Sequence, residues 1–375
     1  QYLAEIVALI FRHEGTVERI VGDAVSVLFS APVAQPDHAR RAVALALDID
    51  RFATAFADDL QSRGIPFGHT RIGVHSGEVL VMASRPSFDL NMFIPGISEE
   101  KYAELREDPS RPLFGRAFQG GYPPASAFKP VVALAALNNG TITEFTAINC
   151  PAYVEYGRHK LWNWSKSAYG PLRVVPAIKH SNNPWFAQVG NKVGWGEFLG
   201  LARRLGFGSR TGLPLMGETP GIVPNDEWMM EHEGRRILNG DTANMSIGQG
   251  SLLASPLQVA QLMAGIANGG ALPKLQLVRQ VHDRRGRVIY ATAPERRNWL
   301  GLNPDVVEVV HKGMYEVVNA GGTGGRGRIG YAKLCAKTGT AQWGAKAKAQ
   351  RLAWFAGFMP YETPRYAFAA LCEGS

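Results

Sequence analysis

A helix that is apolar on every side organises the middle of this chain. It lies in the stretch GYPPASAFKPVVALAALNNG, residues 121–140, where the run VVALAAL leaves no polar face. Prolines at 123 and 124 disfavour helix before Ser126, Pro130 suits the first turn, and Asn139-Gly140 ends it. A helix of this kind is stable only when other elements surround it, so the chain must form a core around it.

Ser126 and Lys129 stand at the start of this helix, three residues apart and therefore on one face. A serine hydroxyl is a poor nucleophile until a base takes its proton, and a lysine can be that base only when its amine is neutral. Burial and the positive end of a helix both lower the pKa of an amine. The pair predicts nucleophilic catalysis, although the spacing alone also fits a capped helix with a surface lysine.

Two later motifs decide between these interpretations. Ser181-Asn182-Asn183 leads into an aromatic helical pattern, and Lys337-Thr338-Gly339-Thr340 follows a short β-rich segment. Ser-x-x-Lys, Ser-x-Asn and Lys-Thr-Gly, in this order, form the signature of the serine penicillin-recognising enzymes. The chain is identified by these motifs as a member of that superfamily.

Spacing and flanking segments narrow the resemblance. The interval between Ser181 and Lys337 is long for a compact class A β-lactamase, and it contains GDTANMSIGQGSLLASPLQVAQLMAGIANGG. Together with GEVLVMASRPSFD and YPPASAFKPV, this stretch resembles the class B penicillin-binding proteins of the elongation type, which are peptidoglycan D,D-transpeptidases. The resemblance covers about residues 77–375. It departs from the family at the nucleophile, where Ala125-Ser126-Ala127 replaces the usual Gly-Ser-Thr.

The resemblance implies a catalytic role for five residues. Ser126 would attack the carbonyl of the penultimate D-Ala of a stem peptide, and Lys129 would be the general base. Ser181 would relay a proton to the leaving amine, while Asn183 would hold Lys129 and the substrate amide. Lys337 would place positive charge near the substrate carboxylate.

The same resemblance assigns substrate contacts to the end of the Lys-Thr-Gly motif. Thr338 and Thr340, which flank Gly339, would hydrogen-bond the terminal carboxylate. The backbone N–H groups of Ser126 and Thr340 would form the oxyanion hole, a group of donors worth roughly 3–4 kcal/mol each. The resemblance implies no cofactor. The implied ligands are D-Ala-D-Ala stem peptides and β-lactams, and the implied partners are the cell-elongation machinery.

A serine β-lactamase or β-lactam sensor is the alternative function from the same motifs. A lactamase needs a carboxylate that activates water for deacylation, and the sequence offers no clear candidate, which favours the transpeptidase.

The family implies a location at the periplasmic face of the inner membrane. In this chain, no apolar run reaches the roughly 18–20 residues that span a bilayer, and no signal peptide is visible.

The first eighty residues differ from the rest in charge and pattern. They hold seven Arg, no Lys and ten Asp or Glu, which gives them a charge of −3 and leaves +11 to the remainder of a chain whose total is +8. A basic region can bind nucleic acid, but no nucleic-acid-binding motif accompanies it, so no such partner is expected.

The first eighty residues also predict a set of helices and strands. Residues 1–15 and 37–64 have helical periodicity, two β-rich runs flank Gly22-Asp23 as in a tight hairpin, and residues 69–81 predict one strand.

Within this part, GTVERIVGDAVSVLFSAP, DHARRAVALAL and RIGVHSGEV resemble the middle of a class III adenylate or guanylate cyclase domain. The resemblance places the family's metal-binding hairpin aspartate at Asp23, and Arg19 replaces its base-reading lysine. The chemistry needs a second aspartate, from a strand that would precede Gln1, because two metal ions hold the triphosphate. Mg²⁺ is implied only for a completed domain. A hairpin carboxylate without metal is the alternative, and a nucleotide-binding or cyclase-like signalling module is the third functional hypothesis.

We therefore expect two parts. Residues 1–76 predict a partial, α+β cyclase-like fragment, and residues 77–375 predict an α/β transpeptidase (serine β-lactamase-like) fold with an antiparallel sheet flanked by helices. Both families have a strand with the sequence GEVLV, here residues 77–81. The resemblance to the cyclases therefore ends, and the resemblance to the transpeptidases begins, within this strand. Compared with these families, we expect the first part to lack its first strand and last third, and the second to lack its membrane anchor, pedestal and closing helix. We interpret the chain as a fusion, or an assembly of fragments, of these two families.

Three further segments carry weaker signals. Glu231-His232-Glu233 has metal-ligand residue types without a second cluster, so a solvated loop is expected. Trp162 and Trp164 are compatible with a glycan groove, but packing or surface exposure explains them as well. The segment GGTGG, residues 321–325, lacks the strand-then-helix setting of a phosphate loop and predicts a mobile connection before the Lys-Thr-Gly strand.

Overall fold

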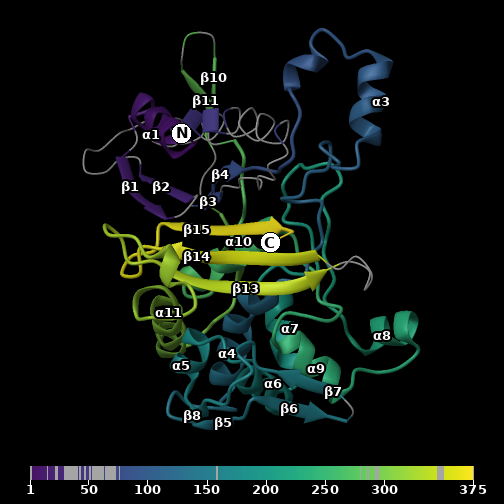
Figure 1. The fold of residues 1–375 in the computed structure, drawn as a ribbon, viewed down its shortest axis with the longest axis vertical. Coiled ribbons are helices and arrows are strands. Elements are labelled where there is room, and N and C mark those ends of the chain that lie inside the picture. The colour runs from purple at the N-terminus through teal and green to yellow at the C-terminus, as the bar shows by residue number, and fades with distance from the viewer. Residues whose placement is uncertain are drawn as a thin grey trace.

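A three-stranded antiparallel sheet runs through the centre of the molecule (Figure 1). The computed structural model describes residues 2–14, 16–21, 24–28, 41, 44–45, 48–49, 52, 63, 73–75, 77–157, 159–278, 280–283, 285, 287–291, 295–343 and 350–374. The strand order is β13 (Cys335–Trp343), β14 (Gln350–Met359) and β15 (Tyr366–Glu373). β14 pairs with both neighbours, so β13 is an edge strand of this sheet, and alternate backbone groups along it face away from β14.

The apolar helix predicted from the sequence is present and buried. It begins as a 3-10 turn, η2 (Ala125–Phe128), and continues as α4 (Lys129–Asn138), in which every residue from Lys129 to Leu137 is buried. η2 contacts β13 and β14, and α4 contacts four other helices: α5 (Val174–Lys179), α6 (Asn183–Val193), α7 (Trp195–Arg204) and α11 (Pro304–Asn319). The core therefore forms around α4, as its all-apolar surface requires.

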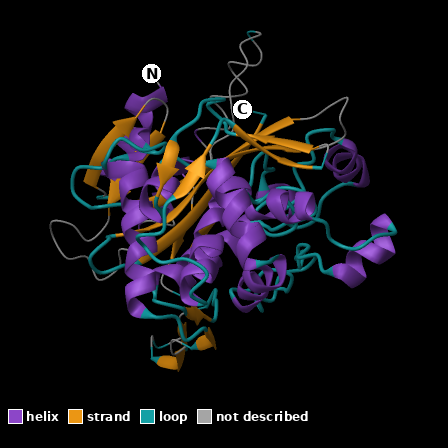
Figure 2. Cartoon of the chain, turned by 90° about the horizontal axis from the view of Figure 1, so that it is seen from below, coloured by secondary structure: helices purple, strands orange, loops and turns teal. Residues whose placement is uncertain are grey.

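The remaining helices cover or extend this core. α10 (Pro256–Ala267) contacts β14 and β15, and Figure 2 shows the helices packed along the strands of the sheet. The other elements of this part are η1 (Leu90–Phe93), α3 (Glu99–Glu107), α8 (Asp226–Glu233), α9 (Asn239–Ser246), η3 (Gly325–Gly327), β5 (Ile148–Cys150), β6 (Tyr153–Tyr156), β7 (His159–Trp162), β8 (Gly170–Leu172), β9 (Ala271–Pro273), β10 (Gln280–His282), β11 (Val288–Ala291) and β12 (Arg296–Trp299).

The predicted single strand over residues 69–81 is wrong in one respect. The structure has two short strands there, β3 (Gly73–His75) and β4 (Val79–Met82), which pair with each other in antiparallel fashion. The backbone reverses at Gly77, whose φ of +76° lies in the left-handed region that glycine adopts without strain. β3 also contacts β15, so this hairpin lies beside the central sheet.

The described part of the N-terminal region agrees with its predicted elements. α1 (Tyr2–Arg12) is followed by β1 (Thr16–Val21) and β2 (Ala24–Leu28), which pair with each other in antiparallel fashion. Residues 41, 44–45, 48–49 and 52, within the second predicted helix, are helical. Among the residues that the structure describes, none of the helices is both long and apolar enough to cross a membrane.

The predicted loop at Glu231-His232-Glu233 is also wrong, because these residues end helix α8. Asn225 caps the start of α8 by accepting from the Trp228 N–H, and Gly234 ends it in the left-handed conformation. His232 stacks on Trp228, with ring centroids 4.2 Å apart. Within the described ranges, no group of three His, Cys, Asp or Glu side chains is arranged to hold a metal ion.

Candidate active site

The amine of Lys129 joins two of the three sequence motifs. Its Nζ donates to the carbonyl of Ser181 at 2.7 Å, lies 3.2 Å from Ser181 Oγ, and donates to Asn183 Oδ1 at 2.6 Å. Lys129 projects from the first turn of α4, while Ser181 and Asn183 stand just before and at the start of α6. Folding thus brings Ser-x-x-Lys and Ser-x-Asn into direct hydrogen-bond contact, as predicted.

The two motif lysines are both fully buried, and this shifts their protonation. Burial, and secondarily the nearby positive charge of Lys337, hold the pKa of Lys129 well below its usual value. Burial alone lowers the pKa of Lys337 to about 7. A neutral amine at Lys129 has a lone pair, which is what a general base requires.

The Lys-Thr-Gly strand lies directly against the 3-10 turn that carries Ser126. A Cβ built on Gly339 would lie 3.2 Å from the backbone nitrogen of Ser126 and from the Cβ of Ala125. These contacts are tighter than most real Cβ contacts, so a side chain at this position would push β13 away from the serine. Because β13 is an edge strand of this described sheet, no further strand of the sheet pairs with its outer side. All three motifs therefore converge on one place.

The backbone on both sides of this place adopts an unusual conformation. Ala125, just before Ser126, has φ of 50°, and Ser181 has φ of 52°. Residues other than glycine rarely occupy this left-handed region, and each such position costs of order 1 kcal/mol or more. The Ala125 N–H donates to the Gly248 carbonyl at 2.8 Å, which helps to hold the turn. Ser126 is partly exposed, whereas Ala125 and its other neighbours in η2 are buried.

Two contacts that the sequence did not predict hold Asn183 in place. Its Nδ2 donates to the carbonyl of Trp162 at 2.9 Å, and its backbone N–H donates to Asn163 Oδ1 at 3.3 Å. With its nitrogen engaged in this way, the amide presents its oxygen to Lys129. The contact with Trp162 uses only a backbone carbonyl, which no sequence pattern could have revealed. Trp162 and Trp164 are about half exposed, at 46% and 58%. The Trp162 ring packs on Tyr153 with centroids 4.6 Å apart, and the Trp164 indole N–H donates to the His180 carbonyl at 2.8 Å.

The remaining predicted ligand-binding residues lie on the same strand. Thr338 is partly buried, its carbonyl accepts from Lys337 Nζ at 2.9 Å, and Thr340 is exposed. The Oγ1 of Thr338 lies 2.7 Å from Oγ1 of Thr323, a contact that the sequence did not predict. Asp23, the predicted metal-binding aspartate, lies outside the described residues.

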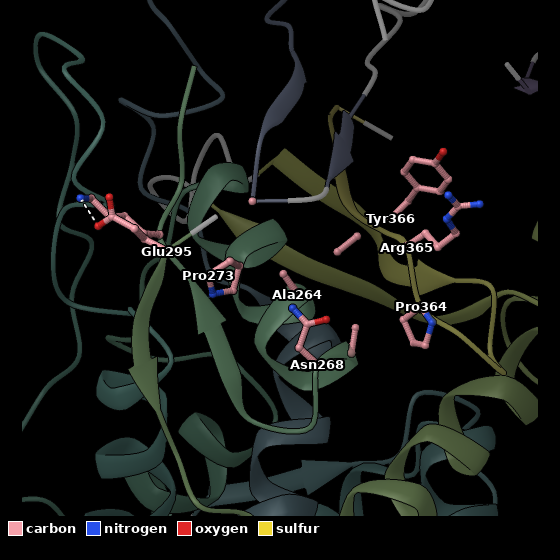
Figure 3. Close-up of a pocket in the computed structure, with 11 residues that line it drawn as sticks. Ala264, Asn268, Pro273, Glu295, Pro364, Arg365 and Tyr366 are labelled. Atoms are coloured by element: carbon pink, nitrogen blue, oxygen red, sulfur yellow. Dashed lines mark hydrogen bonds and ion pairs between the residues drawn. The ribbon is translucent and has the colours of Figure 1, made fainter. Parts of the chain in front are cut away.

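A separate cavity of about 370 Å³ lies near the β3–β4 hairpin. Figure 3 shows Pro273 and Glu295 on one side of this cavity and Pro364–Tyr366 on the other. None of the motif residues lines it, and the one ion pair that Figure 3 marks, Lys274 with Glu295 at 2.7 Å, is largely exposed. The candidate active site is therefore the convergence of the three motifs and not this cavity.

Comparison with known proteins gives a consistent result for most of the chain. The family model "Penicillin binding protein transpeptidase domain" matches residues 72–375. The peptidoglycan D,D-transpeptidase MrdA of Acinetobacter baumannii is 33% identical over 316 residues, 80% of this chain and 47% of that protein. MrdA of Escherichia coli K12 is 32% identical over 314 residues, 80% of this chain and 49% of that protein. This chain thus spans about half the length of these curated relatives.

Two solved structures resemble the fold closely. Pseudomonas aeruginosa PBP2, in complex with WCK 5153, superposes with a TM-score of 0.72 at 34% identity and covers 80% of this chain and 67% of that one. Helicobacter pylori PBP2, in a complex with MreC, gives a TM-score of 0.70 at 34% identity, with 80% of this chain and 56% of that one covered. The predicted antiparallel sheet flanked by helices is confirmed at the level of the transpeptidase fold.

Proposed function

Because this chain belongs to the penicillin-binding protein transpeptidase family, we propose that it carries a peptidoglycan D,D-transpeptidase of the elongation type. The observation that carries the proposal is the buried Lys129 amine, which contacts Ser181 and Asn183 and has a strongly lowered pKa. Such an amine is a general base, and a partly exposed serine stands three residues before it on the same face.

In the first half of the reaction, Ser126 Oγ attacks the carbonyl carbon of the penultimate D-Ala, and Lys129 takes the hydroxyl proton. The bond to the terminal D-Ala then breaks, and the leaving amine receives a proton through Ser181 from the protonated Lys129. The product is a Ser126 ester of the shortened peptide. The 3.2 Å contact between Lys129 Nζ and Ser181 Oγ supports this proton path.

In the second half, the amine of a neighbouring stem peptide attacks the ester carbonyl carbon and loses a proton to Lys129. The ester bond to Ser126 then breaks, and Ser126 Oγ receives that proton, which completes the cross-link and restores the serine hydroxyl. The N–H groups of Ser126 and Thr340 stabilise the negative oxygen that forms in each half. The close approach of Gly339 to the Ser126 nitrogen supports this pairing, since it brings the β13 backbone beside η2. All these steps use groups of the protein and substrate alone.

The substrate carboxylate is assigned to the Lys-Thr-Gly strand. Lys337 provides positive charge, and the hydroxyls of Thr338 and Thr340 donate hydrogen bonds. An anion beside Lys337 would offset the burial that lowers the pKa of its amine to about 7. Stem peptides ending in D-Ala-D-Ala are therefore the proposed substrates, and β-lactams, whose ring amide and carboxylate mimic that end, are the proposed inhibitors.

Partners and location follow from the relatives only as proposals. The Helicobacter pylori relative forms a complex with MreC, and we propose that this chain takes part in the cell-elongation machinery in the same way. This assembly would lie at the periplasmic face of the inner membrane, where peptidoglycan is built.

We also propose that the chain divides into two parts after residue 76. The α1 helix and the antiparallel pairing of β1 with β2 support a separate α+β unit that resembles part of a class III cyclase. The sequence resemblance assigns the family's metal-binding aspartate to Asp23. The contact of β3 with β15 links residues 73–75 to the sheet of the second part. No catalytic role is proposed for residues 1–76, and Mg²⁺ would be needed only in a completed cyclase domain.

Labelling with a fluorescent penicillin tests the function. The chain is mixed with the compound, digested, and the modified residue is located by mass spectrometry. A long-lived adduct at Ser126, lost in Ser126→Ala, is the expected result. Rapid turnover of the adduct would support the β-lactamase alternative, and an unlabelled Ser126 would contradict both.

A further inference from the structure

The glycine-rich segment Gly321–Gly325 follows α11 and precedes β13. It contacts α5, which leads to the Ser-x-Asn motif, and the Lys-Thr-Gly strand. The backbone N–H of Thr323 donates to the carbonyl of Lys179, the last residue of α5, at 3.3 Å. Its Oγ1 lies 2.7 Å from Oγ1 of Thr338 in the Lys-Thr-Gly motif. Thr323 therefore contacts both the helix that leads to Ser181 and the strand that lies beside the nucleophile.

The backbone around Thr323 is held against α11. Gly324 N–H donates to the carbonyl of Val317 at 2.9 Å. A Cβ on Gly322 would lie 2.6 Å from Val317 Cα, a distance that real Cβ atoms essentially never show, so only glycine fits there. Gly321 has φ of +74°, again a conformation that favours glycine. The Thr323 hydroxyl is thus presented to Thr338 by a loop of defined shape.

Two hydroxyls in contact share one hydrogen bond, in which one donates and the other accepts. When Thr323 donates to Thr338, the proton of Thr338 is free to point at a bound anion. When Thr338 donates to Thr323, only lone pairs of Thr338 remain, and these repel a carboxylate. Thr323 is exposed, so its own lone pairs can accept from water in the first arrangement. An anion next to Thr338 therefore selects the arrangement in which Thr323 donates.

We propose that Thr323 is a positioning residue for carboxylate recognition: its hydroxyl donates to Thr338 and turns the Thr338 proton towards the carboxylate of the peptide or β-lactam. This inference rests on the proposed transpeptidase function. It assigns part of the preference for anionic substrates to a residue outside the three motifs, on the loop that follows α11.

The test compares acylation of Ser126 by benzylpenicillin and by its methyl ester, which lacks the carboxylate charge. Thr323→Val removes the hydroxyl and keeps the shape, and Thr323→Ser restores a hydroxyl. Thr143→Val is the matched control, because Thr143 is also an exposed threonine whose Oγ1 pairs with that of another threonine, Thr146, at 3.2 Å, after the far end of α4.

We expect Thr323→Val to lower the second-order acylation rate constant for benzylpenicillin about tenfold, the scale of one hydrogen bond to a charged group. The rate constant for the ester should stay unchanged. Thr323→Ser and Thr143→Val should react like the wild type with both compounds. The ratio of the two rate constants does not depend on the folded fraction, so a partly unfolded variant still gives an answer.

Equal losses for acid and ester in Thr323→Val would overturn the proposal, because they indicate a general disturbance of the site. An unchanged ratio without any loss, or a serine variant that behaves like the valine variant, would overturn it too. A wild-type chain that neither compound acylates contradicts the transpeptidase function itself, which separates that failure from a failure of the role of Thr323.

Discussion

The site contains two fully buried lysines in two different surroundings. On the helical side, the Lys129 amine has three oxygen atoms of Ser181 and Asn183 within hydrogen-bond distance. On the strand side, the Lys337 amine donates to the carbonyl of Thr338 at 2.9 Å. Burial lowers the pKa of both amines. The contacts on the helical side exist before any substrate binds, whereas on the strand side we propose that Lys337 provides charge to a ligand.

In the proposed mechanism, this difference gives opposite roles to two side chains of the same type. The Lys129 pKa is lowered further by the charge of Lys337, so the two lysines favour a state in which one is neutral and the other charged. The neutral amine can accept a proton from Ser126, and the charged one can bind a carboxylate. Substitution of either lysine tests this difference.

The largest expected effect is the loss of the base. Lys129→Met and Lys129→Arg should both slow acylation of Ser126 by benzylpenicillin about a thousandfold, since general base catalysis contributes 10²–10⁴-fold and arginine stays protonated. Acylation rates measured at pH 7 check this. Lys160→Met, a change at an exposed lysine of the β6–β7 hairpin, should leave the rate unchanged. An arginine variant within tenfold of the wild type would show that Lys129 is not the base.

Loss of the charge on the strand side should have a smaller effect. Lys337→Met should slow acylation by benzylpenicillin about a hundredfold, the scale of removing one partner of a charged pair, and should affect the methyl ester much less. Because burial lowers the pKa of Lys337 to about 7, the wild type should lose its preference for the acid over the ester as pH rises above 7. In Lys337→Arg the charge persists, so this decline should be absent. A pH-independent preference in the wild type would contradict the assigned charge.

The smallest expected effect is on stability, and its sign follows from proton binding. Between pH about 7 and 10.4, Lys337 is neutral in the folded chain and protonated in the unfolded chain, so the unfolded state binds more protons. The free energy of unfolding should therefore rise with pH, and Lys337→Met should remove about 1.4 kcal/mol per pH unit of that rise. Urea unfolding of both proteins at pH 7 and pH 9 measures the difference. Identical pH dependence would mean that Lys337 titrates normally.

Local patterns predicted much of the fold and of the site. The all-apolar run after Lys129 gave the buried helix α4, because a helix without a polar face has to be surrounded. The order of the three motifs led to the convergence of Ser126, Lys129, Ser181 and Lys337 on one place. The cap residues Asn225 and Gly234 were also visible signals, and they would have predicted α8 in place of a loop.

Other features depend on contacts that no local pattern encodes. The sequence holds a turn signal at Gly77, where β3 and β4 are separated, but the pairing of these strands and their place beside β15 depend on tertiary contacts. The support of Asn183 by the Trp162 carbonyl uses a group that every residue possesses. The contact of Thr323 with Thr338 joins two segments whose meeting depends on how α11 packs.

By itself, the sequence determined which groups can react: a serine and a lysine on one helical face, an Asn loop and a Lys-Thr-Gly strand. Only the tertiary structure decided their state, because the pKa of an amine depends on the water and charge around it and not on its neighbours in the chain. Packing removed water from Lys129 and Lys337 and brought them close enough to affect each other. That is the physical reason why one of two chemically identical side chains is assigned the base and the other the cation.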